Sequence, residues 1–254
     1  MYSEKARRHK SYKWAKKQMN KWLRIKNKKI NADDAGGYGK KQWLGWEWEE
    51  RNNNMNREEF NAIVNKYLRV IDAFKDEACY IHDVECNQKY GNEPYSVHLK
   101  MVGAFAKTYG HLVCDKEDDV VPMLFGAYFH DAIEDARMTY NDIFKLSKCY
   151  MSKEQATMAT ELVYALTDEK GRNREERGSE KHYEDIKNTP YAPFVKWCDR
   201  YANYVHSVNT HSRMATVYKK EMPNFIKKIG GARYIPQELI DEIINYNPNV
   251  EGEE

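Results

Sequence analysis

The chain lacks the features that mark secreted and membrane proteins. Its five cysteines are scattered and include no Cys-x-x-Cys pair, so we expect neither a disulfide framework nor a zinc–thiolate site. No apolar run reaches the roughly 18 residues that a membrane-spanning helix needs, and no N-terminal apolar stretch resembles a secretory signal. With a mean hydropathy of -0.90, the sequence favours a cytoplasmic protein that does not enter a membrane.

Alternating runs of β-branched residues, which are typical of strands, are also missing. Apolar residues instead recur at helical spacing, and Gly110 separates one such pattern from the next. Pro94 suits the first turn of a helix, where its missing N–H costs nothing, and Ser152 with Gln155 forms a capping box. The sequence therefore predicts an all-α helical bundle, with helices over about 59–81, 94–109, 118–133, 152–166 and 194–205.

The 254 residues suit one domain of moderate size with an extension. Residues 36–39 are rich in glycine and residues 52–56 in asparagine, and both breaks interrupt the pattern near the N-terminus. Between them lies a tryptophan-rich patch, which we expect to dock onto the main domain; it contains Trp43, Trp46 and Trp48. We divide the chain into a basic extension (1–57), a helical domain (58–225) and a C-terminal segment (226–254).

The formal net charge of +2 hides a strong asymmetry along the chain. Residues 1–30 contain twelve lysines and arginines but one acidic residue, Glu4, so the rest of the chain is net acidic. Such a basic segment can contact the phosphates of a nucleic acid. Because charge runs alone do not specify a ligand, a solvated arm is an equally good interpretation.

Histidines and carboxylates gather in three short segments that we expect to be helical. The segments are Tyr95-Ser-Val-His98, His130-Asp131-Ala-Ile-Glu134-Asp135 and Lys196-Trp-Cys-Asp199-Arg200-Tyr-Ala-Asn203. His98 lies on the apolar side of its predicted helix, and one such histidine is more often a core residue than a ligand. Asp199 lies on the buried edge of another helix, where a carboxylate is costly unless it is paired or binds a cation.

The neighbours His130 and Asp131 point about 100° apart if they are helical. One metal ion can contact both only near a helix end or in a crevice between helices. Mixed imidazole and carboxylate ligands favour Mn²⁺, Fe²⁺ or Zn²⁺ over Ca²⁺. A metal held by two imidazoles and two aspartates keeps positions for water and a substrate oxygen. Glu134 and Asp135, one turn on, are then suited to orient or deprotonate that water.

These segments resemble the HD-domain metal phosphohydrolases, and most closely the (p)ppGpp hydrolase domain of the RelA/SpoT family and its small single-domain relatives. That family's pattern is Gly-x-Pro-Tyr-x-x-His, then His-Asp-x-x-Glu-Asp, then Lys-x-x-Asp-Arg-x-x-Asn. The first element corresponds to residues 91–98 and is one residue longer here. His82 fits the histidine that precedes this element in the family. The resemblance covers about residues 70–210.

The resemblance implies an HD-domain phosphohydrolase over 58–225 that uses one divalent metal ion, with Mn²⁺ first and Fe²⁺ or Zn²⁺ as alternatives. It implies metal ligation by His98, His130, Asp131 and Asp199, and activation of water by Glu134 and Asp135. Asn203 is then expected to contact the nucleotide, Tyr95 to line the pocket and Lys89 to lie beside the base. Arg172, Arg174 and Arg177 are phosphate contacts or solvated charges.

Three functions remain open from the sequence. The first is removal of the 3′-pyrophosphate of (p)ppGpp, and the second is release of phosphate from a (deoxy)nucleoside monophosphate by another HD-type enzyme. The third is a nucleic-acid or ribosome-binding protein that uses the basic arm of residues 1–30. The shared HD chemistry does not name the substrate, because specificity depends on the shape of the pocket.

Overall fold

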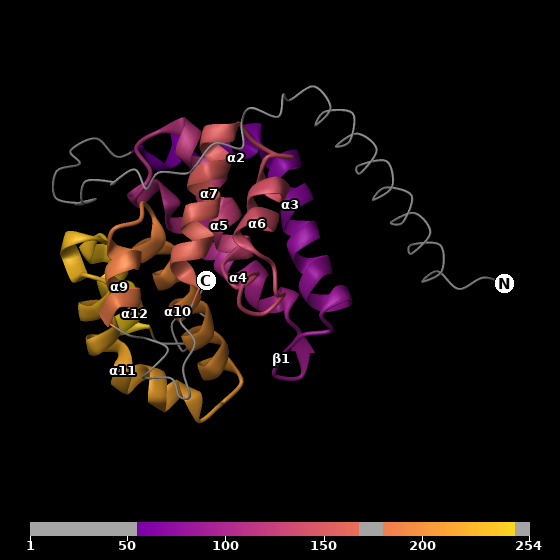
Figure 1. The fold of residues 1–254 in the computed structure, drawn as a ribbon. Helices are drawn as coiled ribbons and strands as arrows, with labels where there is room; N and C mark the ends of the chain where they lie inside the picture. The colour runs from indigo at the N-terminus through magenta and orange to yellow at the C-terminus, as the bar shows by residue number, and fades with distance from the viewer. Residues whose placement is uncertain (1–54, 168–179, 247–254) are drawn as a thin grey trace, which may run out of the picture. The chain divides into compact units, whose positions relative to one another are not determined.

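The computed structural model describes residues 55–167 and 180–246, which all belong to the unit Trp43–Glu254 of the chain (Figure 1). The basic arm, the tryptophan-rich patch and the three arginines Arg172, Arg174 and Arg177 lie outside the described residues. Within the described ranges the predicted all-α fold is confirmed. The strands found there are the two-residue β1 (Lys89–Tyr90) and β2 (Glu93–Pro94), which pair as an antiparallel hairpin.

Most of the described chain is helical, and short helical turns join some of the longer helices. The turns are η3 (Ile81–Glu85), η4 (Gly110–Leu112) and η5 (Gly231–Arg233). The helices are α2 (Arg57–Lys66), α3 (Leu68–Tyr80), α4 (Ser96–Tyr109), α5 (Glu117–Phe129), α6 (Tyr140–Ser147), α7 (Lys153–Leu166), α9 (Glu180–Lys187), α10 (Ala192–Asn209), α11 (Met214–Lys228) and α12 (Gln237–Asn245).

Helix starts follow local capping chemistry. The capping box predicted at Ser152 and Gln155 is present at the start of α7. A second capping box joins Asn56 and Glu59 at the start of α2. The expected domain boundary at residue 57 therefore falls one residue after an N-cap. We expected Pro94 in the first turn of a helix, but it lies in β2. It pairs there with Lys89, two residues before α4 begins.

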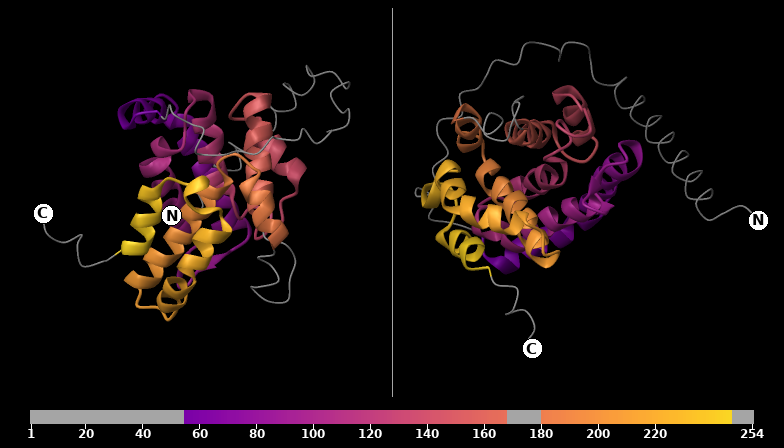
Figure 2. Two further views of the ribbon diagram at one scale, coloured as in Figure 1. Left: turned by 90° about the vertical axis from the view of Figure 1, so that its left-hand side faces the viewer. Right: turned by 90° about the horizontal axis from the view of Figure 1, so that it is seen from below.

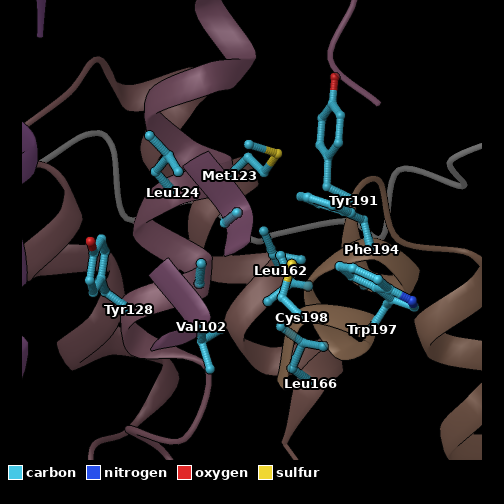
Figure 3. Packing of buried hydrophobic residues seen from close by; sticks show 14 of the residues in the cluster. Val102, Met123, Leu124, Tyr128, Leu162, Leu166, Tyr191, Phe194, Trp197 and Cys198 are labelled. Atoms are coloured by element: carbon cyan, nitrogen blue, oxygen red, sulfur yellow. The ribbon is translucent and has the colours of Figure 1, made fainter. Parts of the chain in front are cut away.

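Helix α5 forms the centre of the bundle. Every residue from Val120 to Phe129 is buried, and a helix that is buried on all sides must be covered by neighbours. It contacts α3, α4, α7 and α10, and Figure 3 shows buried side chains that these helices contribute, among them Val102 of α4, Leu162 of α7 and Trp197 of α10. Dense packing of this kind fixes the ends of the helices that carry the polar segments.

The C-terminal helices complete the same core. In Figure 1 and in the right-hand view of Figure 2, α11 and α12 lie on the side of the bundle opposite α3. The Trp197 indole N–H of α10 donates a 2.9 Å hydrogen bond to the Leu239 carbonyl of α12. The expected boundary between residues 225 and 226 falls inside α11, where Phe225 and Ile226 are both buried. None of the described helices has the length and apolar character needed to cross a membrane.

Candidate metal centre

Three segments that are distant in the sequence bring polar atoms to one point. His98 comes from the first turn of α4, His130 directly follows the end of α5, and Asp199 comes from the second turn of α10. The Nε2 atoms of the two histidines lie 3.2 Å apart, and Oδ1 of Asp199 lies 3.3 Å from Nε2 of His98. The ligand atoms of these three residues all lie within 4.8 Å of one another, so they can hold one metal ion.

A carboxylate oxygen of Asp131 lies beside this group of three. Its Oδ2 lies 2.8 Å from Nε2 of His130 and 3.7 Å from Nε2 of His98. The sequence predicted a helix through this segment, but α5 ends at Phe129 and the residues after it form turns. Because His130 and Asp131 stand just beyond a helix end, two adjacent residues face one centre. His98, His130 and Asp199 therefore form the group that can hold a metal ion, and Asp131, the fourth expected ligand, lies 2.8 Å from His130.

The His130 imidazole is oriented for metal binding. Nδ1 of His130 lies 3.0 Å from the Ala127 carbonyl, an atom that only accepts hydrogen bonds, so Nδ1 carries the proton. Neutral His130 then directs its Nε2 lone pair at the carboxylates and at His98. A deprotonated imidazole nitrogen and a carboxylate oxygen both accept hydrogen bonds. Where they face one another at 2.8–3.3 Å, as here, they need a cation or a proton between them. This donor set fits a divalent metal ion with imidazole and carboxylate ligands.

Burial and charge strongly perturb the centre. The two imidazoles are 2% exposed, Asp131 19% and Asp199 15%. Burial lowers the pKa of His98 and His130, but the two carboxylates outweigh it, raising the pKa of His98 to about 9 and that of His130 above its ordinary value. Burial raises the pKa of both aspartates, yet His130 beside Asp131 and Lys196 beside Asp199 hold these pKa values below their usual range.

Neighbouring side chains orient both carboxylates. The Tyr95 hydroxyl donates a hydrogen bond to Oδ2 of Asp131. The Asn203 amide donates to Oδ1 of Asp199 at 2.7 Å, while Lys196 Nζ lies 3.5 Å from its Oδ2. Partners of this kind hold a metal-binding carboxylate in one rotamer. Asn203, which we expected to contact the nucleotide, and Tyr95, which we expected to line the pocket, thus each donate a hydrogen bond to a carboxylate of the candidate metal centre.

Tyr90 is a site residue that the sequence reasoning missed. Its hydroxyl donates a 2.9 Å hydrogen bond to Oδ1 of Asn203, and its ring centroid lies 4.9 Å from that of His98 and 4.2 Å from that of His206. The β1–β2 hairpin thus places an aromatic ring against a ligand. The sequence signal that could have indicated Tyr90 is an aromatic residue directly before a glycine. Gly91 has a positive φ of 62°, which permits the tight turn between β1 and β2.

The two expected catalytic carboxylates are both exposed, in the turns after α5. Asp135 Oδ2 accepts a 2.6 Å hydrogen bond from Nε2 of Gln88, and the Asp135 backbone N–H donates to the Asp131 carbonyl at 2.8 Å. Glu134 is the preceding residue. Lys89, expected beside the base, is exposed on β1. The Asp135 carboxylate therefore lies one turn after Asp131 and is accessible to water.

Comparisons with known proteins found no match to this chain, whether against models of protein families, curated sequences or solved structures.

Proposed function

We propose that this protein is a metal-dependent phosphohydrolase that acts on a nucleotide and removes the 3′-pyrophosphate of (p)ppGpp. The observation that supports it most is the convergence of two imidazoles and the Asp199 carboxylate from α4, α10 and the end of α5, with the Asp131 carboxylate 2.8 Å from His130. The buried ligand set, its oriented partners and an exposed carboxylate beside it are the parts that metal-assisted hydrolysis of a phosphate ester requires.

His98, His130, Asp131 and Asp199 would hold the metal ion. When bound, a divalent ion supplies Lewis acidity toward a phosphoryl oxygen and lowers the pKa of a coordinated water. Asp135 and Glu134, which are exposed to solvent, receive a proton from the attacking water and orient it. The water oxygen bonds to the phosphorus attached to the 3′-oxygen of ppGpp and the bond between that phosphorus and the 3′-oxygen breaks. The departing 3′-oxygen takes up the proton that the carboxylate received from the water, which gives guanosine 5′-diphosphate and pyrophosphate and leaves the carboxylate ionised again.

The choice of (p)ppGpp rests on the resemblance of the three motifs to the RelA/SpoT hydrolase domain. The ring of Tyr90 and the exposed Lys89 on the same hairpin are suited to a nucleobase and a phosphate, respectively. Arg172 and Arg174, outside the described residues, are proposed as further phosphate contacts. Tyr95 and Asn203 act on the substrate through the ligands that they orient.

Product analysis on a nucleotide panel tests the proposal. Purified protein is incubated with Mn²⁺ and with ppGpp, pppGpp or each deoxynucleoside monophosphate, and the products are separated by ion-exchange chromatography. We expect pyrophosphate from ppGpp and pppGpp, and no product from an Asp199→Ala variant. Inorganic phosphate from the monophosphates alone would support the second HD-type function instead. Absence of hydrolysis across the panel in the metal-loaded protein would contradict both.

A further inference from the structure

A chain of hydrogen bonds leads from a buried histidine to one of the exposed carboxylates. His82 lies in η3 and has no solvent exposure. Its Nδ1 lies 2.6 Å from Oε1 of Gln88, whose Nε2 donates to Oδ2 of Asp135 at 2.6 Å. The Gln88 backbone N–H also donates to the His82 carbonyl at 2.8 Å. Neither His82 nor Gln88 contributes to the ligand set described above.

Only one arrangement of protons satisfies both side-chain contacts when Asp135 is ionised. A carboxylate accepts hydrogen bonds, so the Gln88 amide must present its NH₂ group to Asp135. The amide oxygen then faces His82, and Nδ1 of His82 must carry the proton. A rotated amide would place its oxygen against the Asp135 carboxylate and break this pairing. The histidine and the carboxylate thus fix the amide from opposite ends.

We propose that His82 and Gln88 are positioning residues that hold the Asp135 carboxylate in the single orientation needed for its catalytic role. The inference deepens the proposed function and depends on it only for the role of Asp135. Asp135 needs such partners because it is exposed and follows the end of α5, where no helical packing restricts its side chain. A buried donor that fixes a glutamine amide supplies that restriction at the cost of one polar group in the core.

His82 has a second contact that offers a competing explanation. Its ring stacks on Tyr95 with centroids 5.0 Å apart and an interplanar angle of 17°, and Tyr95 donates to the ligand Asp131. A loss of activity on changing His82 would therefore also result if the ring merely supported Tyr95. The two explanations differ in the part of the ring that matters. Positioning of Gln88 needs the Nδ1–H group, whereas support of Tyr95 needs the aromatic surface.

Two substitutions at position 82 separate these atoms. His82→Asn places a side-chain N–H near the position of Nδ1 and removes the ring, whereas His82→Phe keeps a stacking ring and removes the donor. At position 88, Gln88→Met removes both amide groups at similar length, and Gln88→Glu keeps the acceptor for His82 but places a carboxylate oxygen against Asp135. Thermal unfolding and Mn²⁺ content are recorded for each variant, so that only folded, metal-loaded proteins are compared.

The expected pattern is a loss in kcat without a change in KM or in metal content. We expect His82→Phe, Gln88→Met and Gln88→Glu to lose roughly 10-fold to 100-fold in kcat toward ppGpp, as misplacement of a reacting group does. His82→Asn should retain more activity than His82→Phe. If His82→Phe equals the wild type, or if His82→Asn loses as much as or more than His82→Phe, the donor is not what matters and the proposal is overturned. Unchanged kcat in both Gln88 variants overturns it as well.

A measurement without substrate tests the hydrogen-bond order directly. Long-range ¹H–¹⁵N correlation spectra of the imidazoles distinguish a protonated from an unprotonated ring nitrogen, and the His82 signals are assigned by their absence in His82→Asn. At pH 8 the ring is neutral, since burial lowers the pKa of His82. We expect a protonated Nδ1 and a bare Nε2, and the opposite tautomer would overturn the proposal. If the wild type hydrolyses nothing on the panel, the proposed function fails, while this spectrum still decides the hydrogen-bond order.

Discussion

The Asn203 side-chain amide donates a 2.7 Å hydrogen bond to Oδ1 of Asp199, four residues earlier on α10. The same Oδ1 lies 3.3 Å from Nε2 of His98, so the amide aims the carboxylate at the metal centre. The Tyr90 hydroxyl in turn donates to Oδ1 of Asn203. Tyr90 of the β1–β2 hairpin is therefore linked to Asp199 of α10 through the side chain of Asn203.

Removal of this amide should weaken metal binding. We expect Asn203→Ala to lower Mn²⁺ affinity by roughly 10-fold to 100-fold, the usual effect of losing a residue that orients a ligand. The measurement is the Kd for Mn²⁺ from electron paramagnetic resonance of the free ion. Asn209→Ala, an exposed change at the end of the same helix, serves as the control. Equal affinities for the wild type and Asn203→Ala would mean that Asp199 needs no orienting partner.

Metal content should depend on each of the four ligands. We expect single alanine variants of His98, His130, Asp131 and Asp199 to lose bound Mn²⁺, because three of them form one group of ligand atoms and Asp131 lies 2.8 Å from His130 in that group. Elemental analysis after gel filtration measures the content. Full occupancy in Asp199→Ala would show that the ligand assignment is wrong.

The exposed carboxylates should matter for turnover and not for metal binding. Glu134→Gln and Asp135→Asn are expected to lower kcat by roughly 10²–10⁴-fold, as loss of a general acid or base does. Metal content should stay at the wild-type level, because the ligand atoms lie on other residues. Steady-state kinetics with ppGpp and elemental analysis provide the two readouts. Wild-type rates in both variants would remove these residues from the mechanism.

Metal affinity should rise with pH. In the metal-free protein the pKa of His98 is raised from 6.5 to about 9, since the two carboxylates outweigh burial. The imidazole binds metal only when it is deprotonated, so binding below pH 9 must displace a proton. The affinity for Mn²⁺ is therefore expected to increase by at least about tenfold per pH unit between pH 6.5 and 8.5, since the pKa of the second imidazole, His130, is raised as well. Titrations at constant ionic strength measure it, and a flat profile would contradict a protonated His98.

Removal of the basic arm should separate two properties. The cut belongs after residue 54, because the Met55 N–H donates to the Cys114 carbonyl and Asn56 caps α2. We expect residues 55–254 to keep hydrolysis and to lose salt-dependent binding to RNA, because each neutralised phosphate releases counterions. Filter binding across a salt series, with the full chain as control, measures the affinity.

Equal RNA affinity in both proteins would assign the arm to a solvated extension. Loss of hydrolysis on truncation would instead support the docking of Trp43, Trp46 and Trp48 onto the helical domain, as the sequence predicts.

The proposed ligands were predictable because each departs from a regular pattern. Asp199 interrupts the buried side of an apolar helix, and His98 is a polar residue on the core side of another. Helix periodicity identifies such residues, since it states which face is buried. The adjacency of His130 and Asp131 also required a helix end, and α5 ends at Phe129.

Gln88 and Tyr90 were not predictable in the same way. Both lie in the short segment between η3 and the β2 strand, which carries no periodic pattern. Their roles depend on the fold, since Gln88 meets Asp135 across 47 residues and Tyr90 meets Asn203 across 113. Pro94 lies in β2, and its chemistry suits an edge strand as well as the first turn of a helix, so the residue type alone does not decide between the two.

The most direct test of the central claim is product analysis of ppGpp with wild-type protein and Asp199→Ala in the presence of Mn²⁺. We predict guanosine 5′-diphosphate and pyrophosphate in equal amounts from the wild type, none after chelation of the metal and none from Asp199→Ala. Persistent turnover in Asp199→Ala, or an inert wild type with a full complement of Mn²⁺, would contradict the account.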